Sequence, residues 1–166
     1  MEFSKEVLEE LDWIISRYPQ KEAALLPALR LLEREFGEVS EDGMKYVAQL
    51  LGIPPAKVYG VFTFYTHYRR PGQGKYHIQV CSTLPCALRN SEALFDSISE
   101  KLGIDNGETS SDGKFSLQKV ECLAACDHAP FLQINEDDYA DVTPEKMDKI
   151  LSSLTEDHKK KKKKDL

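Results

Sequence analysis

Residues 76–102 read YHIQVCSTLPCALRNSEALFDSISEKL and contain, in order, a strand pattern, a loop and a helix pattern. Residues 76–82 place Ile78 and Val80 on one face, as a strand with one buried side does. Residues 90–102 carry apolar side chains at helical spacing, namely Leu94, Phe95, Ile98 and Leu102. The stretch therefore predicts a strand and then a helix that can return the chain to the sheet.

The segments that follow complete a sheet. Residues 115–122 (FSLQKVEC) and residues 131–134 (FLQI) have strand patterns, and we expect a short return strand at residues 139–142. A last helix is expected after Thr143, a suitable N-cap, with Pro144 at the first helical position. Strand, helix, strand and then strand, strand, helix is the order of a thioredoxin-like sandwich, with a parallel crossover pair and an antiparallel final hairpin.

The first seventy residues predict helices instead. Apolar side chains recur at helical spacing from Phe3 to Ile15, and a second stripe ends at Gly37, a residue suited to a helix C-cap. Ser40 precedes a third stripe that Gly52 ends, and a proline pair then opens a short helix into VYGVFTFY. These three or four short helices predict a small bundle.

The turn-rich segment RRPGQG separates the two patterns. We therefore predict an α/β (α+β) chain with an N-terminal small helical bundle over residues 1–72 and a thioredoxin-like domain with a mixed sheet over residues 73–156. Residues 157–166 contain a run of lysines, and like charges repel, so we expect a disordered lysine-rich tail there.

Charge and hydropathy restrict the class of protein. The net charge is −6 even though Lys159 to Lys164 are all cationic, so the rest of the chain is strongly acidic. An acidic body repels phosphate backbones, and we expect no nucleic-acid partner. The N-terminus is acidic where a signal peptide is basic, and no apolar run is long enough to span a bilayer. The sequence predicts a cytosolic, soluble protein.

All four cysteines of the chain lie in two tight pairs, C-x4-C and C-x3-C, and each pair begins where a predicted strand ends. If those strands are neighbours in the sheet, the four thiols meet at one edge of it. Four thiolates complete either a tetrahedral zinc site or an iron–sulfur cluster, and the spacing leaves both open. A catalytic dithiol would need C-x-x-C, which neither pair has. The candidate ligands are Cys81, Cys86, Cys122 and Cys126.

Other polar residues near the cysteines have weaker signals. His128 follows Cys126 closely and is a candidate for tuning the centre without binding it. Ser82 and Thr83 are candidates for hydrogen bonds to sulfur, and Pro130 invites comparison with the cis-proline of thioredoxin folds. Surface or structural roles are expected for His67, His77 and His158. Core or subunit contacts are expected for Trp13, Phe62, Phe64, Tyr65 and Tyr68.

Longer stretches resemble a known family. CSTLPCALRN and ECLAACDHAP resemble the cluster-binding segments of the thioredoxin-like 2Fe-2S ferredoxin family, specifically its NuoE-type subunits of NADH:quinone oxidoreductase, respiratory complex I. RYPQKEAALLPALRLLEREFG, YVAQLLGIP and VYGVFTFYTHY resemble the helical region of those subunits in the same order. The chain departs from the family at Ala124, where glycine is usual, and alanine would be strained at a positive φ.

The resemblance implies a role for each cysteine. Cys81, Cys86, Cys122 and Cys126 would bind one 2Fe-2S cluster, and no residue of the chain would be catalytic. The cluster would exchange single electrons with FMN in a partner NuoF-type flavoprotein subunit that binds NADH, beside further complex I subunits, so the isolated chain would not oxidise NADH. The protein would be cytoplasmic, peripheral on the inner face of the cell membrane through the larger complex.

Three alternatives remain at this stage, one of them a free-standing ferredoxin that senses redox state. The same module could serve an NAD-linked hydrogenase or formate dehydrogenase, which share the flavin and cluster chemistry. A different class of protein, a zinc-stabilised binding module without redox activity, would use the same four thiols.

Overall fold

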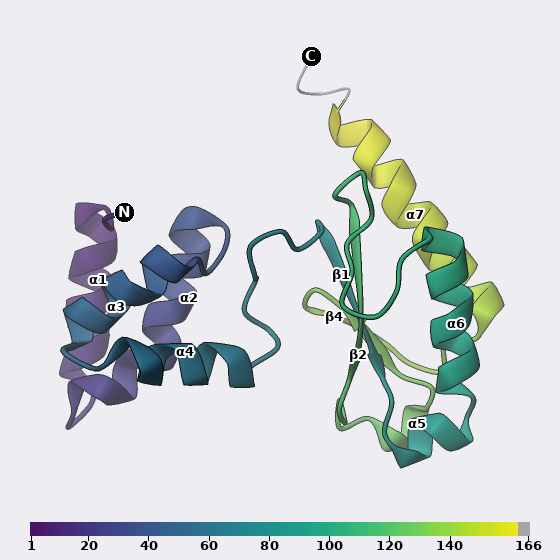
Figure 1. Cartoon of the computed structure of the whole chain (residues 1–166), viewed down its shortest axis with the longest axis horizontal. Helices are drawn as coiled ribbons and strands as arrows, with labels where there is room; N and C mark the ends of the chain where they lie inside the picture. The colour runs from purple at the N-terminus through teal and green to yellow at the C-terminus, as the bar shows by residue number, and fades with distance from the viewer. Residues whose placement is uncertain (163–166) are drawn as a thin grey trace. The chain divides into compact units, whose positions relative to one another are not determined.

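The computed structural model describes residues 1–162 of the chain. The chain divides into two compact units, the first from Met1 to Gly72 and the second from Gln73 onward (Figure 1). Among the described helices, none has both the length and the apolar character that crossing a membrane requires.

The first unit is the helical bundle that the apolar stripes predict. Leu29 and Leu32 have no exposed surface at its centre, and burying such a side chain stabilises a fold by about 1.5–3 kcal/mol. Gly37 and Gly52 end two of the helices with φ of 81° and 67°, the left-handed region in which glycine is unstrained. The helical elements are α1 Lys5–Ser16, η1 Lys21–Ala24, α2 Leu25–Phe36, α3 Glu41–Leu51 and α4 Pro55–Phe64.

The second unit is a four-stranded mixed sheet in the order β2-β1-β3-β4. β1 and β2 are parallel neighbours, while β3 pairs antiparallel with both β1 and β4. Helices α6 and α7 lie on one face of the sheet (Figure 1), where the fully buried Ile78 and Leu117 pack with them. The elements are β1 Tyr76–Cys81, α5 Leu84–Leu88, α6 Ser91–Leu102, β2 Phe115–Val120, η2 Cys126–His128, β3 Leu132–Ile134, β4 Asp137–Tyr139 and α7 Pro144–Lys162.

The last strand is not where the sequence placed it. β4 runs over Asp137–Tyr139 and not over residues 139–142, because β3 and β4 form a tight hairpin in which Ile134 pairs with Asp137. Asn135 opens its two-residue turn with φ of 56°, a conformation that asparagine tolerates better than most residues. The correct boundary therefore depends on turn chemistry that strand periodicity does not show.

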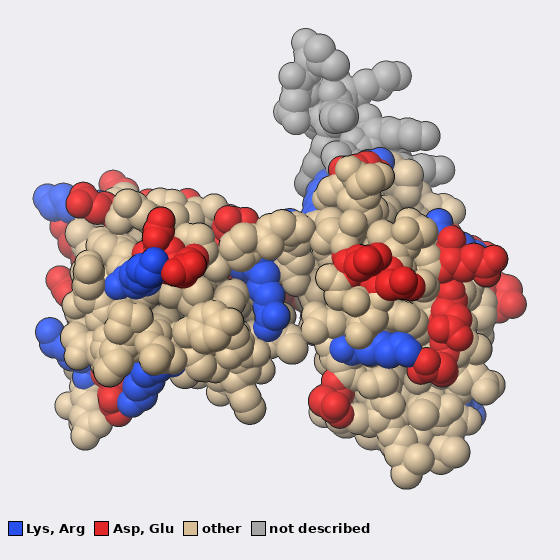
Figure 2. Space-filling view, viewed as in Figure 1, with Lys and Arg blue, Asp and Glu red and all other residues tan. Residues whose placement is uncertain are grey.

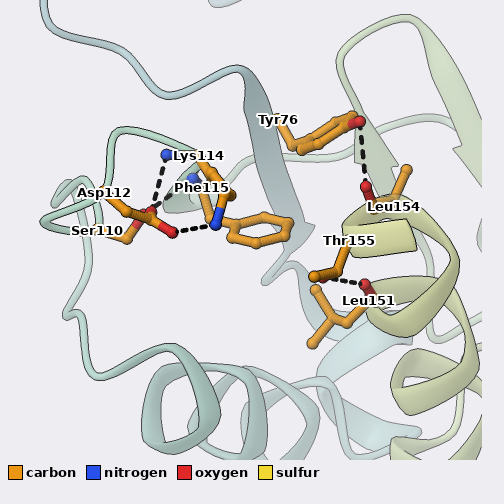
Figure 3. Close-up of polar contacts among 8 residues, drawn as sticks. All are labelled: Tyr76, Ser110, Asp112, Lys114, Phe115, Leu151, Leu154 and Thr155. Atoms are coloured by element: carbon orange, nitrogen blue, oxygen red, sulfur yellow. Dashed lines mark hydrogen bonds and ion pairs between the residues drawn. The ribbon is translucent and has the colours of Figure 1, made fainter. Parts of the chain in front are cut away.

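Helix α7 is capped at its start and is hydrogen-bonded to β1 further along. Thr143 caps its start by accepting a hydrogen bond of 3.2 Å from the Lys146 backbone N–H, as predicted. Further along, the Tyr76 hydroxyl donates to the Leu154 carbonyl oxygen at 3.3 Å (Figure 3). The helix continues to Lys162, where the sequence led us to expect disorder, and residues 163–166 of the predicted tail lie outside the described part of the chain.

A compact turn leads into β2. The Asp112 carboxylate accepts hydrogen bonds from the Ser110 hydroxyl at 2.7 Å and the Lys114 backbone N–H at 3.0 Å, and it pairs with the Lys114 ammonium group at 2.6 Å (Figure 3). The Lys114 ammonium, followed by these other donors, holds the pKa of Asp112 well below its ordinary value. The turn therefore fixes where β2 begins.

Candidate metal centre

The two cysteine pairs come together because β1 and β2 are parallel. Cys81 is the last residue of β1, and it lies in register with Val120, the last residue of β2. Cys122 follows two residues after that strand ends. Carboxyl ends of parallel neighbours lie at the same edge of a sheet, so the prediction that both pairs start at one edge is confirmed.

The second cysteine of each pair lies on a short helix. Cys126 begins η2, and its Sγ lies 3.8 Å from the Sγ of Cys122. Cys86 lies in α5, a helix that the sequence analysis took for loop, at the end of the sheet where β1 finishes (Figure 1). Its thiol is close enough to that of Cys81 to lower the pKa of Cys81. The sulfurs are thus arranged as two pairs.

The two pairs differ in exposure. Cys81 and Cys86 are each 2% exposed and pack with Ala129 and Phe131 in a small apolar cluster. Cys122 and Cys126 are exposed. One side of the centre is therefore enclosed by protein, and the other faces outward.

Several hydrogen-bond donors point at the sulfurs. The Ala124 backbone N–H donates to Cys122 Sγ at 3.3 Å, and the Thr83 hydroxyl lies 3.2 Å from Cys81 Sγ. Burial raises the pKa of the Cys81 thiol, but hydrogen bonds from the Thr83 hydroxyl and from the backbone of Leu123 and Thr83 more than offset it, leaving that pKa below its ordinary value. The site therefore favours a thiolate at Cys81, the form that binds metal.

The pKa of the partner thiol, Cys86, is shifted in the opposite direction. Burial, reinforced by the neighbouring Cys81 and Cys126, raises the pKa of Cys86 to about 11, although a backbone hydrogen bond from Phe131 opposes the shift. The hydrogen bond with Cys122 is the main cause that raises the pKa of Cys126. Without a cation these sulfurs therefore resist becoming anionic together, which is the expected behaviour of ligands brought close to share positive charge.

The donor set fits a two-iron cluster. Such a cluster takes two thiolates on each iron, and the site offers two pairs of thiols with backbone N–H groups directed at sulfur. Ala124, Ala125 and Ala129, which lie close to the cysteines in sequence, have small side chains. Among the side chains that the structure describes, no three from His, Cys, Asp or Glu are gathered closely enough to hold a single metal ion.

Of the neighbouring polar residues, Thr83 makes the contact expected of it and Ser82 does not, while a tuning role for His128 stays a prediction. Thr83 makes the predicted contact with sulfur. Ser82 does not, because its hydroxyl donates instead to the Val120 carbonyl oxygen at 3.0 Å and joins the ends of β1 and β2. His128 lies 3.3 Å by its Nδ1 from an Asp141 carboxylate oxygen, a partner that sequence spacing did not indicate.

The backbone near the centre has two special conformations. The peptide bond before Pro130 is cis, as the thioredoxin comparison suggested. Ala124 has φ of 62°, the left-handed conformation in which its Cβ crowds the backbone, so the strain predicted for alanine at this position is present.

The aromatic candidates separate into core and surface. Phe62 and Tyr68 are buried in the helical unit, where the Tyr68 hydroxyl donates to the Leu26 carbonyl oxygen at 3.0 Å. Phe64 is 77% exposed and Trp13 is 59% exposed, with the Arg17 guanidinium 5.1 Å above the indole ring.

Two other histidines have described side chains, His67 and His77. His77 is buried in β1, and His67 packs against Tyr68 with ring centroids 4.3 Å apart. His158 lies in the part of α7 whose side chains are not described.

Fold and site together define a class of protein. A thioredoxin-like sheet whose strand ends gather two cysteine pairs is the arrangement of a 2Fe-2S ferredoxin, and the sequence profile of the thioredoxin-like [2Fe-2S] ferredoxin family matches residues 11–155. The chain belongs to that family.

Within the family, particular relatives are similar over nearly their whole length. One NADH-quinone oxidoreductase subunit, from Rickettsia bellii, is 45% identical over 158 residues, which cover 93% of this chain and 95% of that protein. NADH-quinone oxidoreductase subunit 2 of Thermus thermophilus is 40% identical over 157 residues, with 93% and 87% covered. The chain is therefore similar to subunits of an NADH-oxidising complex.

Among solved structures, an NAD⁺-reducing [NiFe]-hydrogenase in the H2-reduced state has a similar fold. The TM-score is 0.66 at 16% sequence identity, and the match covers 77% of this chain but only 22% of the hydrogenase chain. At this identity the likeness concerns the fold alone.

Proposed function

We propose that the chain is the one-electron carrier of an NADH:quinone oxidoreductase and that its four cysteines ligate one 2Fe-2S cluster. The observation that carries the proposal is the meeting of two thiol pairs at the carboxyl ends of parallel β1 and β2. The names of the similar proteins support the kind of complex. The proposed ligands are Cys81, Cys86, Cys122 and Cys126.

The chemistry explains why a separate flavin is needed. NADH gives up a hydride, which carries two electrons, whereas a 2Fe-2S cluster takes one at a time. A flavin in a neighbouring subunit accepts the hydride and passes electrons on singly. We therefore assign FMN and NADH to a NuoF-type partner, and this chain reaches the cytoplasmic face of the membrane only through the assembled complex.

The helical unit offers a surface for that partner. Along α4, Tyr59 and Phe64 are 58% and 77% exposed, and Tyr59 lines a groove of about 440 Å³ together with Met44 and Ala56. Large exposed aromatic side chains around an apolar groove are typical of a protein contact. Acidic side chains form patches on the face of the second unit seen in Figure 2, which agrees with the absence of nucleic acid from the proposed function.

Metal analysis tests the cluster. Protein purified without oxygen is expected to be red-brown, to contain two irons and two sulfides per chain, and to give a paramagnetic EPR signal after reduction by one electron. With four anionic thiolates and no histidine ligand, its potential is expected near roughly −400 mV. A colourless protein with one zinc would replace this proposal with the zinc-stabilised module.

Reconstitution tests the partner. Co-expression with an FMN-binding NADH dehydrogenase subunit is expected to give a stable pair in which NADH reduces the cluster, while the isolated chain does not react with NADH. Phe64→Asp is expected to weaken the pair with the cluster intact, and removal of residues 159–166 serves as the control that leaves both unchanged. An isolated chain that oxidised NADH would contradict the assignment.

A further inference from the structure

Thr83 occupies a position at which a threonine hydroxyl usually accepts a hydrogen bond from a backbone N–H. It is the N-cap of α5, with φ of −75° and ψ of 165°, and N-cap threonines normally accept a hydrogen bond from the second or third helical residue. Here the side chain makes no capping hydrogen bond. Part of the reason is local, since Pro85 occupies the second helical position and has no N–H to offer.

The hydroxyl is directed at sulfur instead. Thr83 Oγ1 lies 3.2 Å from Cys81 Sγ, beside a thiol that is only 2% exposed. In the free thiol either atom can be the donor. A metal-bound Cys81 has no S–H, so the hydroxyl is then the donor and the sulfur the acceptor.

We propose that Thr83 is a positioning residue that raises the reduction potential of the centre through this hydrogen bond. The inference rests on the cluster ligation proposed above. Reduction adds one electron to the cluster and breaks no bond, so the ligand sulfurs become more negative and accept hydrogen bonds more strongly. A donor held at Cys81 therefore stabilises the reduced state more than the oxidised state, and hydrogen bonds to sulfur are a known determinant of cluster potentials.

The variant that isolates the hydroxyl is Thr83→Val, which keeps the branched shape. It removes no capping hydrogen bond, and the first bond of the helix, from the Ala87 N–H to the Thr83 carbonyl oxygen at 2.9 Å, uses only backbone. At the wild-type midpoint we expect the ratio of reduced to oxidised cluster to fall about fivefold, which corresponds to a midpoint about 41 mV lower at 59 mV per tenfold. Thr83→Ser restores the hydroxyl and is expected to restore the midpoint.

Ser82 provides a matched control. Ser82 directly precedes Thr83 in the chain, but its hydroxyl donates to the Val120 carbonyl oxygen and not to sulfur. Ser82→Ala is therefore expected to lower the free energy of unfolding, by losing a strand-to-strand hydrogen bond, and to leave the midpoint unchanged. Thr83→Val is expected to do the opposite, with a lower midpoint and little change in stability.

The measurement is a dithionite titration of the full chain with redox mediators, followed by EPR and visible circular dichroism, on protein whose iron and sulfide content matches the wild type. An unchanged midpoint in Thr83→Val, a Thr83→Ser midpoint equal to that of the valine variant, or an equal shift in Ser82→Ala would each overturn the inference. If the valine variant assembles no cluster, Thr83→Ala compared with Thr83→Ser makes the same test.

Wild-type protein without a 2Fe-2S cluster would refute the proposed function itself. That result differs from a cluster whose midpoint potential does not change when Thr83 is replaced, which would refute only the inference about Thr83.

Discussion

The two cysteine pairs have the same chemistry but are held in different ways. Cys81 and Cys86 are buried, the first at the end of strand β1 and the second in the short helix α5. Cys122 and Cys126 are exposed, the first in a loop that contains the strained Ala124 and the second at the start of η2. The difference indicates that the buried pair is part of the packed fold, whereas the exposed pair is held mainly by the loop and by whatever the sulfurs bind.

Serine substitutions should have the largest effect. Changing any one of the four cysteines to serine is expected to abolish or severely deplete the cluster, because the site offers no spare sulfur. The apoproteins should then differ. Cys86→Ser buries a hydroxyl and is expected to cost about 1–3 kcal/mol, while Cys122→Ser should stay within about 0.5 kcal/mol of wild type.

Iron and sulfide analysis measures the first effect, and urea unfolding of the apoproteins measures the second. Equal stability losses for Cys86→Ser and Cys122→Ser would remove the distinction between a packed pair and a loop-held pair.

Alkaline pH should reveal the effect of burying Cys86 on the stability of the apoprotein. In the folded apoprotein the pKa of Cys86 is raised from its ordinary 9.0 to about 11, so folding favours the protonated thiol. This contribution to stability is present below the ordinary pKa and is lost as pH rises from there through about 11. Urea midpoints of wild-type apoprotein are expected to fall across this window more steeply than those of Cys86→Ala. Parallel pH profiles would show that the buried thiol is not linked to folding.

Relief of strain at Ala124 should give a moderate gain. Its φ of 62° suits glycine, so Ala124→Gly is expected to stabilise the protein by about 1 kcal/mol, or about 2–4 °C in the thermal midpoint. Ala125, at φ of −120°, is the matched control, and Ala125→Gly should destabilise by about 0.4–1 kcal/mol. Calorimetry of both variants measures the contrast. A loss of stability in Ala124→Gly equal to that in Ala125→Gly would mean that the loop is unstrained.

His128 should matter least. Its side chain is 58% exposed and its Nδ1 is directed at Asp141, not at a sulfur. His128→Gln is therefore expected to keep the full iron content and to change the ratio of reduced to oxidised cluster by less than about threefold at a fixed potential, since exposed charges are screened by water. Loss of iron in this variant would show that the exposed side of the centre depends on more than its two cysteines.

Periodicity and strand order were enough to predict most of the second unit. Ile78 and Val80 mark β1 by simple alternation, and the placement of a cysteine at the end of each parallel strand predicts where the thiols meet. Helix α5 was missed because five residues are too few for a helical stripe to show. β4 was misplaced because Asn135 forms a turn whose length only the hairpin register reveals.

Side-chain direction at the site was harder to predict. Ser82 and Thr83 are both small hydroxyl residues close to Cys81, and the sequence indicates a hydrogen bond to sulfur equally for each of them. The structure separates them because the chain leaves the strand at this point, so that Ser82 reaches back to Val120 while Thr83 turns toward the thiol. Such choices depend on backbone angles that composition does not encode.

Trp13 has a further consequence for optical measurements. It is the only tryptophan of the chain and lies in α1, in the helical unit, whereas all four cysteines lie in the second unit. Indole fluorescence therefore reports on the helices, and the visible absorption of a bound cluster reports on the sheet. Denaturation followed at both wavelengths would separate the melting of the two units, because coincident curves are expected only if they unfold as one cooperative block.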